Sequence, residues 1–272
     1  VDGACKVFEK GYRCKLMAAD YVQFPEIPPC PDEFDVEIPS SSLRGMINRT
    51  MFAASKEANR MSLHGIFLEI ADKSFSLIST DGRRMSVTAL DVESDVCNSV
   101  ILPASSMAFV YKLLGDNDDP VQVTIQEGDV VFKFDCIDIF VRSLHGQYPP
   151  VKKSIPQQFA VTLELDRKKF IDILDKAKEL TTDLSNTAIF EFSDTGLKLS
   201  ASSQQYGEAT VSHDIGTYEY EPITIGFKPT TIKDALTKMS MDTFTMSLNN
   251  GDSAIKLDEG KSFSYIANPI KL

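Results

Sequence analysis

The segment with the clearest chemical potential is Thr80-Asp81-Gly82-Arg83-Arg84, which places a glycine and two guanidinium groups directly after an apolar run. Such a turn can bind a phosphate, because backbone N–H groups approach closely at a glycine and guanidinium groups bind phosphate oxygens in pairs. The same residues also fit a solvated hairpin corner, since Asp and Gly are common turn residues. Both interpretations remain open from these residues alone.

Other residues that could support catalysis are few and scattered. His64 and His145 each precede a glycine near a predicted turn, and His213 lies in a predicted strand. None has a nucleophile or a metal ligand at a useful spacing. The chain also lacks the serine-hydrolase, zinc-protease, Walker and dinucleotide-binding motifs. These residues therefore predict no catalytic centre, no metal site and no cofactor.

The cysteines and the hydropathy bound the type of protein. No apolar run reaches the roughly 18 residues of a membrane span, and the first residues lack the charged and apolar regions of a signal peptide. The five cysteines form no Cys-x-x-Cys pair, which is unlike a disulfide framework or a zinc site. We expect a cytoplasmic protein whose reduced cysteines are small buried residues: Cys5, Cys14, Cys30, Cys97 and Cys136.

Four segments have the apolar spacing of helices, and a chain of 272 residues has room for about two domains. Ser40 to Ser42 are expected to cap the first segment and Asp166 the third. Gly115 is expected to end the second, and Pro229 to begin the fourth. The segments are 40–56, 104–114, 166–180 and 229–239.

Nearly everything else has the pattern of short strands separated by turn residues such as Glu127-Gly128-Asp129 and Asp258-Glu259-Gly260. The pattern predicts an α+β fold with mostly antiparallel pairing. The clearest strands are 66–71, 75–80, 121–126, 130–135, 137–143, 188–193, 243–248 and 262–267.

The same series of elements occurs twice along the chain. Ile66 to Ala188 and Val121 to Thr243 are each 122 residues apart, and Pro149 to Pro269 is 120. A fixed period over several landmarks indicates an internal duplication. Residues 1–28 match the end of such a repeat, which predicts that the sequence begins inside a first domain. The predicted domains are 1–28, the terminal hairpin of a truncated domain, then 29–150 and 151–272.

With these repeats, the chain resembles the bacterial DNA sliding clamps, the beta subunits of DNA polymerase III. The resemblance rests on four motifs in their order and spacing: Thr80 to Met85, Val100-Ile101-Leu102-Pro103, Gly146-Gln147-Tyr148-Pro149 and Asn268 to Leu272. It implies tandem clamp domains, each with two helices packed on antiparallel sheets. It also implies a non-catalytic processivity factor that encircles duplex DNA as a head-to-tail dimer. A chain without most of the first domain is expected to be monomeric.

The charge distribution agrees with that implication better than the total charge does. The chain carries a net charge of −11, which is unfavourable for a DNA partner, yet the four helical segments hold 11 Lys or Arg and only five acids. Helices that face phosphates and an acidic rim would give this segregation, although solvated helix faces are often basic as well. The expected contacts, without base readout, are Arg44, Arg49, Lys56, Arg60, Lys169, Lys176 and Lys238.

The resemblance also implies a cleft between the last two domains that binds a Gln-Leu-x-Leu-Phe-like motif of the polymerase, the clamp loader and other partners. Arg83, Asn268 and Thr231 depart from the family's usual residues there. Met85 is expected at an open position, where Met85→Asp would abolish binding and leave the fold intact. The expected cleft residues are Leu63, Thr80, Gly82, Arg83, Arg84, Met85, Pro149, Lys153, Ile266, Ala267, Asn268, Pro269, Ile270 and Lys271.

Two other functions stay open. A clamp-like scaffold would bind protein partners without DNA. An α+β hydrolase would turn over a phosphate or ester substrate and would lose that activity on mutation of Asp81 or His145.

Overall fold

The computed structural model describes residues 4–17, 28–57, 61–126, 128–156, 158–178, 187–203 and 207–272, which belong to two units. The first unit, Val1–Asp32, contains an antiparallel hairpin of β1 (Ala4–Glu9) and β2 (Tyr12–Met17). Its large apolar side chains are exposed: Val7, Phe8, Tyr12, Leu16 and Met17. Within the described residues of this unit, the hairpin therefore buries no apolar core.

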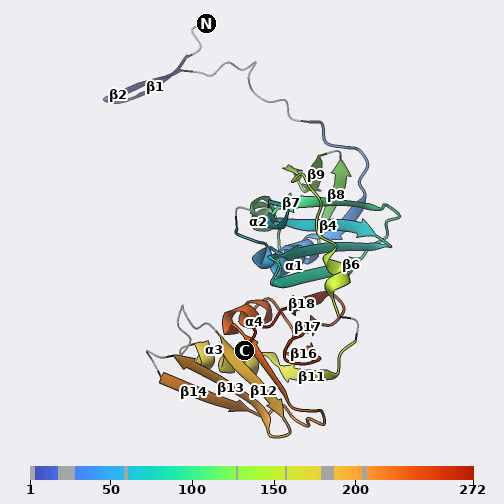
Figure 1. Cartoon of the computed structure of the whole chain (residues 1–272). Coiled ribbons are helices and arrows are strands. Elements are labelled where there is room, and N and C mark those ends of the chain that lie inside the picture. The colour runs from blue at the N-terminus through green and yellow to red at the C-terminus, as the bar shows by residue number, and fades with distance from the viewer. Residues whose placement is uncertain are drawn as a thin grey trace. The chain divides into compact units, whose positions relative to one another are not determined.

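The second unit, Glu33–Leu272, contains two copies of one series of elements (Figure 1). A 3₁₀ helix, η2 (Met51–Ala53), follows α1, and another, η3 (Met61–His64), precedes β4. The first copy, called the middle repeat, consists of β3 (Val36–Pro39), α1 (Ser40–Thr50), β4 (Gly65–Ala71), β5 (Ser74–Thr80), β6 (Arg84–Asp91), β7 (Asn98–Pro103), α2 (Ala104–Leu113), β8 (Pro120–Gln126), β9 (Asp129–Phe134) and β10 (Ile137–Arg142).

The second copy, called the C-terminal repeat, has the same order of strands and helices. The 3₁₀ helix η4 (Val151–Ser154) lies between the two repeats. The C-terminal repeat consists of β11 (Val161–Asp166), α3 (Arg167–Lys178), β12 (Ala188–Ser193), β13 (Gly196–Ser203), β14 (Gly207–His213), β15 (Ile223–Phe227), α4 (Pro229–Leu236), β16 (Thr243–Leu248), β17 (Ile255–Glu259) and β18 (Phe263–Ala267).

Strands of the two repeats join into one continuous sheet. Its order is β11-β16-β17-β18-β6-β5-β4-β7, and each repeat has a further four-stranded sheet, β10-β9-β8-β3 in the middle repeat and β14-β13-β12-β15 in the C-terminal repeat. The junction is the antiparallel pair β18–β6, whose register runs from Phe263 opposite Thr88 to Ala267 opposite Arg84. The α+β fold with tandem, mainly antiparallel domains is thus confirmed.

Alternating polarity explains which face of each strand is buried. In β11, Val161, Leu163 and Leu165 are buried while Thr162 and Glu164 are exposed. Successive side chains of a strand point to opposite faces, so this period of two directs one face inward. The helix α3 covers that core with residues spaced three and four apart: Phe170, Ile173, Leu174 and Ala177.

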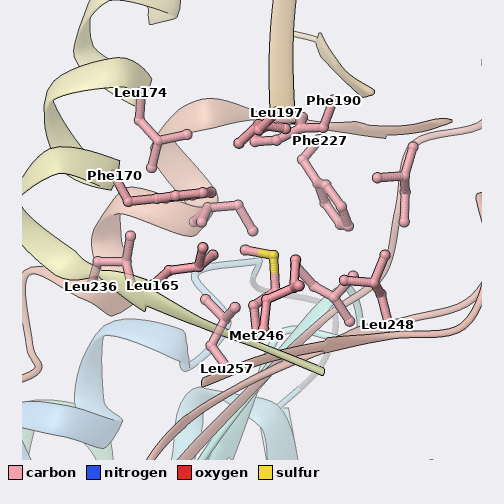
Figure 2. Packing of buried hydrophobic residues seen from close by; sticks show 14 of the residues in the cluster. Leu165, Phe170, Leu174, Phe190, Leu197, Phe227, Leu236, Met246, Leu248 and Leu257 are labelled. Carbon is pink, nitrogen blue, oxygen red and sulfur yellow. The ribbon is translucent and has the colours of Figure 1, made fainter. Parts of the chain in front are cut away.

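Figure 2 shows the core of the C-terminal repeat, where Phe170 and Leu174 project from α3 toward the sheets. Phe170 packs edge-on against Phe244, with ring centroids 5.5 Å apart. Phe190 and Phe227 pack similarly at 5.8 Å. Burial of such aromatic side chains removes a large apolar area from water, which is the main stabilising term for each repeat.

The helices form one layer of the second unit, in the spatial order α2, α1, α4, α3 (Figure 1). Helices α1 and α2 pack together, as do α3 and α4. Helices α1 and α4 meet at the joint between the repeats, where Lys238 Nζ, just past the end of α4, donates to Asn48 Oδ1 at 2.9 Å. The helix pairs of the two repeats therefore adjoin at this joint.

The first helix begins where it was predicted, but its capping groups and its end differ from the prediction. It begins at Ser40, and its first N–H groups donate to the carbonyls of Asp119 and Asn117, so a loop of the same repeat takes the capping role expected of Ser40 to Ser42. It ends at Thr50, whose hydroxyl donates to the Met46 carbonyl at 2.8 Å, and it tightens into η2 instead of continuing to 56. The predicted cap of α3 is confirmed, because Asp166 Oδ1 accepts the Lys169 N–H at 2.9 Å.

The prediction of buried cysteines was wrong. Cys5, Cys97 and Cys136 are exposed, and Cys14 and Cys30 are half-buried. They lie in the hairpin, in connecting segments or in turns, and apolar composition alone does not show that these segments are at the surface.

Candidate functional site

The β5–β6 turn holds the residues from Thr80 to Arg84 in place through hydrogen bonds of its own side chains. Gly82 has φ of +89°, which a residue with a side chain rarely adopts. Asp81 Oδ1 accepts the N–H groups of Arg83 and Arg84 at 2.9 and 3.0 Å, and Thr80 Oγ1 accepts the Gly82 N–H at 3.0 Å. Side chains of the turn thus satisfy the backbone donors that a bound phosphate would need.

The Arg84 guanidinium is engaged by three groups. Its Nε donates to Asp81 Oδ2 at 3.1 Å, its Nη1 to Asp234 Oδ2 at 3.0 Å, and its Nη2 to the Phe52 carbonyl at 3.0 Å. Burial lowers the pKa of Arg84, but the nearby Tyr265, Asp234 and Asp81 outweigh that effect and raise it above its usual value. Arg84 is therefore a fixed cation that bridges the two repeats.

A cleft of about 350 Å³ lies beside this turn, at the joint between the repeats. This is within the size range of small-ligand and peptide-anchor pockets. The middle repeat, the linker and the end of β18 all contribute to its lining, which is largely apolar with a polar rim. The lining residues are Leu63, Thr80, Gly82, Arg83, Arg84, Met85, Pro149, Val151, Ile266 and Asn268.

Nine of the fourteen residues expected at this cleft line it, and five do not. Ala267 is fully buried in β18, and Ile270 is held away by an antiparallel bridge to Gly226. Lys271 lines a separate hollow with Thr224 and Asp252. Lys153 and Pro269 are also outside the lining. Val151 was missed, although it is an apolar residue directly after Pro149-Pro150.

The expectation that Met85 occupies an open position was wrong. Its side chain is only 5% exposed and packs with Ile78 and Ile266. It also faces Ile266 across the β18–β6 pair that joins the repeats. A charge at this position would be buried in the joint, so Met85→Asp would damage the fold as well as the cleft.

The cations expected to contact DNA fall into two groups. Lys56, Lys169 and Lys176 are exposed, and Arg44 lies over the Tyr111 ring at 4.7 Å from its centroid. Arg60 lies outside the described residues.

Arg49 and Lys238 belong to the joint between the repeats. Arg49 donates to Ser240 Oγ at 2.9 Å and to the Lys238 carbonyl at 3.3 Å, and it pairs with Glu259 at 2.9 Å. Lys238 donates to Asn48. Either side chain would have to leave these partners to bind a phosphate.

Two acidic residues of the joint, Glu259 and Asp234, were not predicted from the sequence. Glu259 was placed in a turn, but it is the last residue of β17 and is buried, with Oε1 accepting the N–H groups of Ser240 and Met241 at 2.5 Å each. Asp234 was counted only as a helix charge. Neither role has a local sequence signal, because each partner lies far along the chain.

Comparisons with known proteins agree on one family. Two family models match: DNA polymerase III beta subunit, central domain, over residues 37–150, and the C-terminal domain of the same subunit over residues 152–270. The beta sliding clamp of Bacillus subtilis is 27% identical over 225 residues, covering 81% of this chain and 60% of that protein. The beta sliding clamp of Vibrio cholerae is 25% identical over 263 residues, covering 96% and 72%.

A solved structure shows the same fold. The crystal structure of the DNA polymerase sliding clamp from Bacillus subtilis matches with a TM-score of 0.91 at 22% sequence identity, covering 100% of this chain and 73% of that one. The chain thus spans 60 to 72% of the length of the two relatives named above. Among the described residues, no helix is long and apolar enough to cross a membrane.

Proposed function

Because the chain belongs to the DNA polymerase III beta subunit family, we propose that it forms part of a DNA sliding clamp, a non-catalytic processivity factor of the cytoplasm. We propose residues 1–28, 29–150 and 151–272 as the end of one clamp domain and two further ones. The observation that carries the proposal is the joint: two equivalent repeats share one sheet, keep their basic helices in one layer and leave a cleft between them.

The helix layer is the proposed DNA-facing surface. Lys56, Lys169 and Lys176 supply exposed ammonium groups without base readout, and Arg44 a guanidinium. Such contacts give weak, salt-dependent binding, which suits a protein that slides. Arg49 and Lys238 contribute to the local positive field while they hold the joint.

Helix α2 supports a further domain contact. Phe109 and Leu113 are 56% and 39% exposed. They stand 125 residues before Asp234 and Lys238, and α2 and α4 begin with the same spacing. Since Asp234 and Lys238 contact the neighbouring repeat, Phe109 and Leu113 are at the equivalent place to pack against another domain of this fold. This supports a ring of such domains, closed in the complete protein by a head-to-tail dimer.

The cleft is the proposed binding site for a Gln-Leu-x-Leu-Phe-like motif of the polymerase, the clamp loader and other partners. Leu63, Met85 and Ile266 form an apolar floor, and Arg83 and Asn268 a polar rim. An extended peptide with leucine and phenylalanine anchors fits this chemistry.

Methyl NMR of the 272-residue protein with labelled methionines tests this site without altering it. On addition of acetylated, amidated Gln-Leu-Ser-Leu-Phe, the Met85 methyl resonance is expected to shift at micromolar peptide. The Met107 resonance, from a side chain buried under α2, is the internal control. If the Met85 resonance does not shift on addition of the peptide, the cleft is not the peptide-binding site.

A clamp-like scaffold without DNA binding is the second candidate, favoured by the engagement of Arg49 and Lys238 in the joint. A mobility shift with duplex DNA at low salt separates the two. Binding that weakens steeply with salt supports the clamp, and no binding supports the scaffold.

The oligomeric state is a separate test. We expect light scattering to show that the 272 residues alone are monomeric. The reason is that the closed ring is proposed for the complete protein, and the relatives are longer than this chain. A stable closed dimer of this chain would contradict the proposed assembly.

A further inference from the structure

The Arg84 side chain belongs both to the cleft and to the joint between the repeats. It lines the cleft, and its guanidinium lies over the Phe52 ring, 5.5 Å from the centroid. Phe52 in turn stacks on Tyr265 of the C-terminal repeat, with centroids 5.8 Å apart. This wall of the cleft therefore consists of a cation held between an aromatic ring and carboxylates.

The partners of Arg84 come from both repeats. Asp81 and the Phe52 carbonyl belong to the middle repeat, as Arg84 itself does. Asp234 comes from α4, 150 residues away, and does not line the cleft. Helix α4 is fixed beneath it by the buried Ile232 and Leu236. Two groups of the other repeat thus act on the guanidinium, Tyr265 and Asp234, and Asp234 is the one that pairs with it through a carboxylate.

From this geometry we propose that Asp234 is a positioning residue for the cleft: it holds the Arg84 guanidinium toward α4, so the cleft wall has its binding shape only while α4 is in place. The inference rests on the proposed peptide-binding function. It makes peptide affinity depend on a carboxylate that the peptide does not touch. By linkage, a bound peptide also favours the joined arrangement of the repeats.

A purely structural role of the Asp234–Arg84 pair would make its loss lower the melting temperature, whereas a positioning role lowers peptide affinity. The Asp234 side chain is 51% exposed, and exposed ion pairs contribute little to the free energy of unfolding. Loss of the pair should therefore hardly change the melting temperature. It would, however, free the Nη1 donor of Arg84, and a side chain that samples several positions binds a ligand less well than a fixed one.

The test is the affinity of the acetylated, amidated pentapeptide by fluorescence anisotropy with the 272-residue protein. Asp234→Asn removes the charge with almost no change of shape. We expect its Kd to rise about three- to tenfold, in the lower part of the range of coupling between contacting residues. Asp242→Asn is the matched control, because Asp242 is 81% exposed and pairs with Lys168 at 3.0 Å, outside the cleft lining.

A double-mutant cycle separates positioning from general damage. In an Arg84→Lys background the guanidinium is absent, so Asp234→Asn is expected to leave the remaining affinity unchanged. Equal Kd values for wild type and Asp234→Asn, or a loss that persists in the Arg84→Lys background, overturn the inference while the cleft stands. A wild type that does not bind the peptide overturns the proposed function and the inference together.

Discussion

Removal of the Glu259 carboxylate tests how the two repeats are held together. This side chain is 2% exposed, and its Oε1 accepts the N–H groups of Ser240 and Met241. Its Oε2 forms an ion pair with Arg49 without a hydrogen bond, since the 2.9 Å contact is not aligned for one. The Ser240 hydroxyl also donates to Oε1, at 3.3 Å, so Glu259→Ala removes three accepted hydrogen bonds and one ion pair at once.

The magnitude follows from these four interactions. Each lost hydrogen bond costs about 0.5–1 kcal/mol, the lower part of the usual range, because Ser240 and Met241 are exposed and can bind water instead. Arg49 is 20% exposed and keeps its contact with Ser240, so the lost pair adds about 1 kcal/mol. The sum is about 2.5–4 kcal/mol, which corresponds to about 5–15 °C in melting temperature for a unit of this size.

Calorimetry of the 272-residue protein measures that shift. Glu259→Gln keeps an oxygen acceptor and loses the charge, so it is expected to fall between wild type and Glu259→Ala. Glu164→Ala, an exposed glutamate of β11, is the matched control and should melt near wild type. If Glu259→Ala melts within about 1 °C of wild type, the carboxylate does not stabilise the joint and the reasoning is refuted.

Three further outcomes are expected. Burial raises the pKa of Tyr148 and of Tyr265 above the usual value of 10, so stability should fall as the pH rises above 10; a free energy of unfolding that does not fall as the pH is raised above 10 would contradict this. The Lys169 N–H lowers the pKa of Asp166, so the stabilisation of α3 by the Asp166 carboxylate is complete above the usual pKa of 3.8 and is lost as the pH falls below it. If the amides of α3 exchange hydrogen at the same rate in Asp166→Ala as in the wild type at pH 7, the cap is refuted. Lys169→Ala with Lys176→Ala should flatten the salt dependence of DNA binding by about one unit per lost contact, and an unchanged slope would place the DNA elsewhere.

The sequence predicted the repeat and most strands because their signals are local. Alternating residues such as Val161, Leu163 and Leu165 specify a strand face within six positions. The cap of α3 was also readable, since Asp166 and its donor Lys169 are three residues apart. The first helix was predicted too long because Thr50 bonds back to Met46, which competes with the regular helix and is not visible in hydrophobic spacing.

The residues of the joint could not be read in this way. Arg49 has the type and spacing of a solvated helix cation, and only its distant partners, the Lys238 carbonyl and Glu259, show that it is a link between repeats. Met85 was assigned to an open cleft from the resemblance, yet its pairing with Ile266 buries it. In both cases the deciding contact spans most of the chain.

The duplication helps to identify residues of the joint from the sequence, because equivalent positions of the two repeats can be compared within one chain. Phe109 and Asp234 occupy the same place on α2 and α4, and Leu113 and Lys238 each follow four residues later. The first of these pairs of positions, on α2, is apolar and exposed, whereas Asp234 and Lys238 are polar and contact the other repeat. The fold therefore determines where a helix contacts the neighbouring domain, while the residue types determine whether that contact is polar or apolar. The polar residues at α4 connect the joint to the cleft through Arg84, whereas the apolar residues at α2 favour a contact by hydrophobic packing. Substituting the α2 pair by Asp and Lys would leave this 272-residue protein folded, since both positions are at its surface.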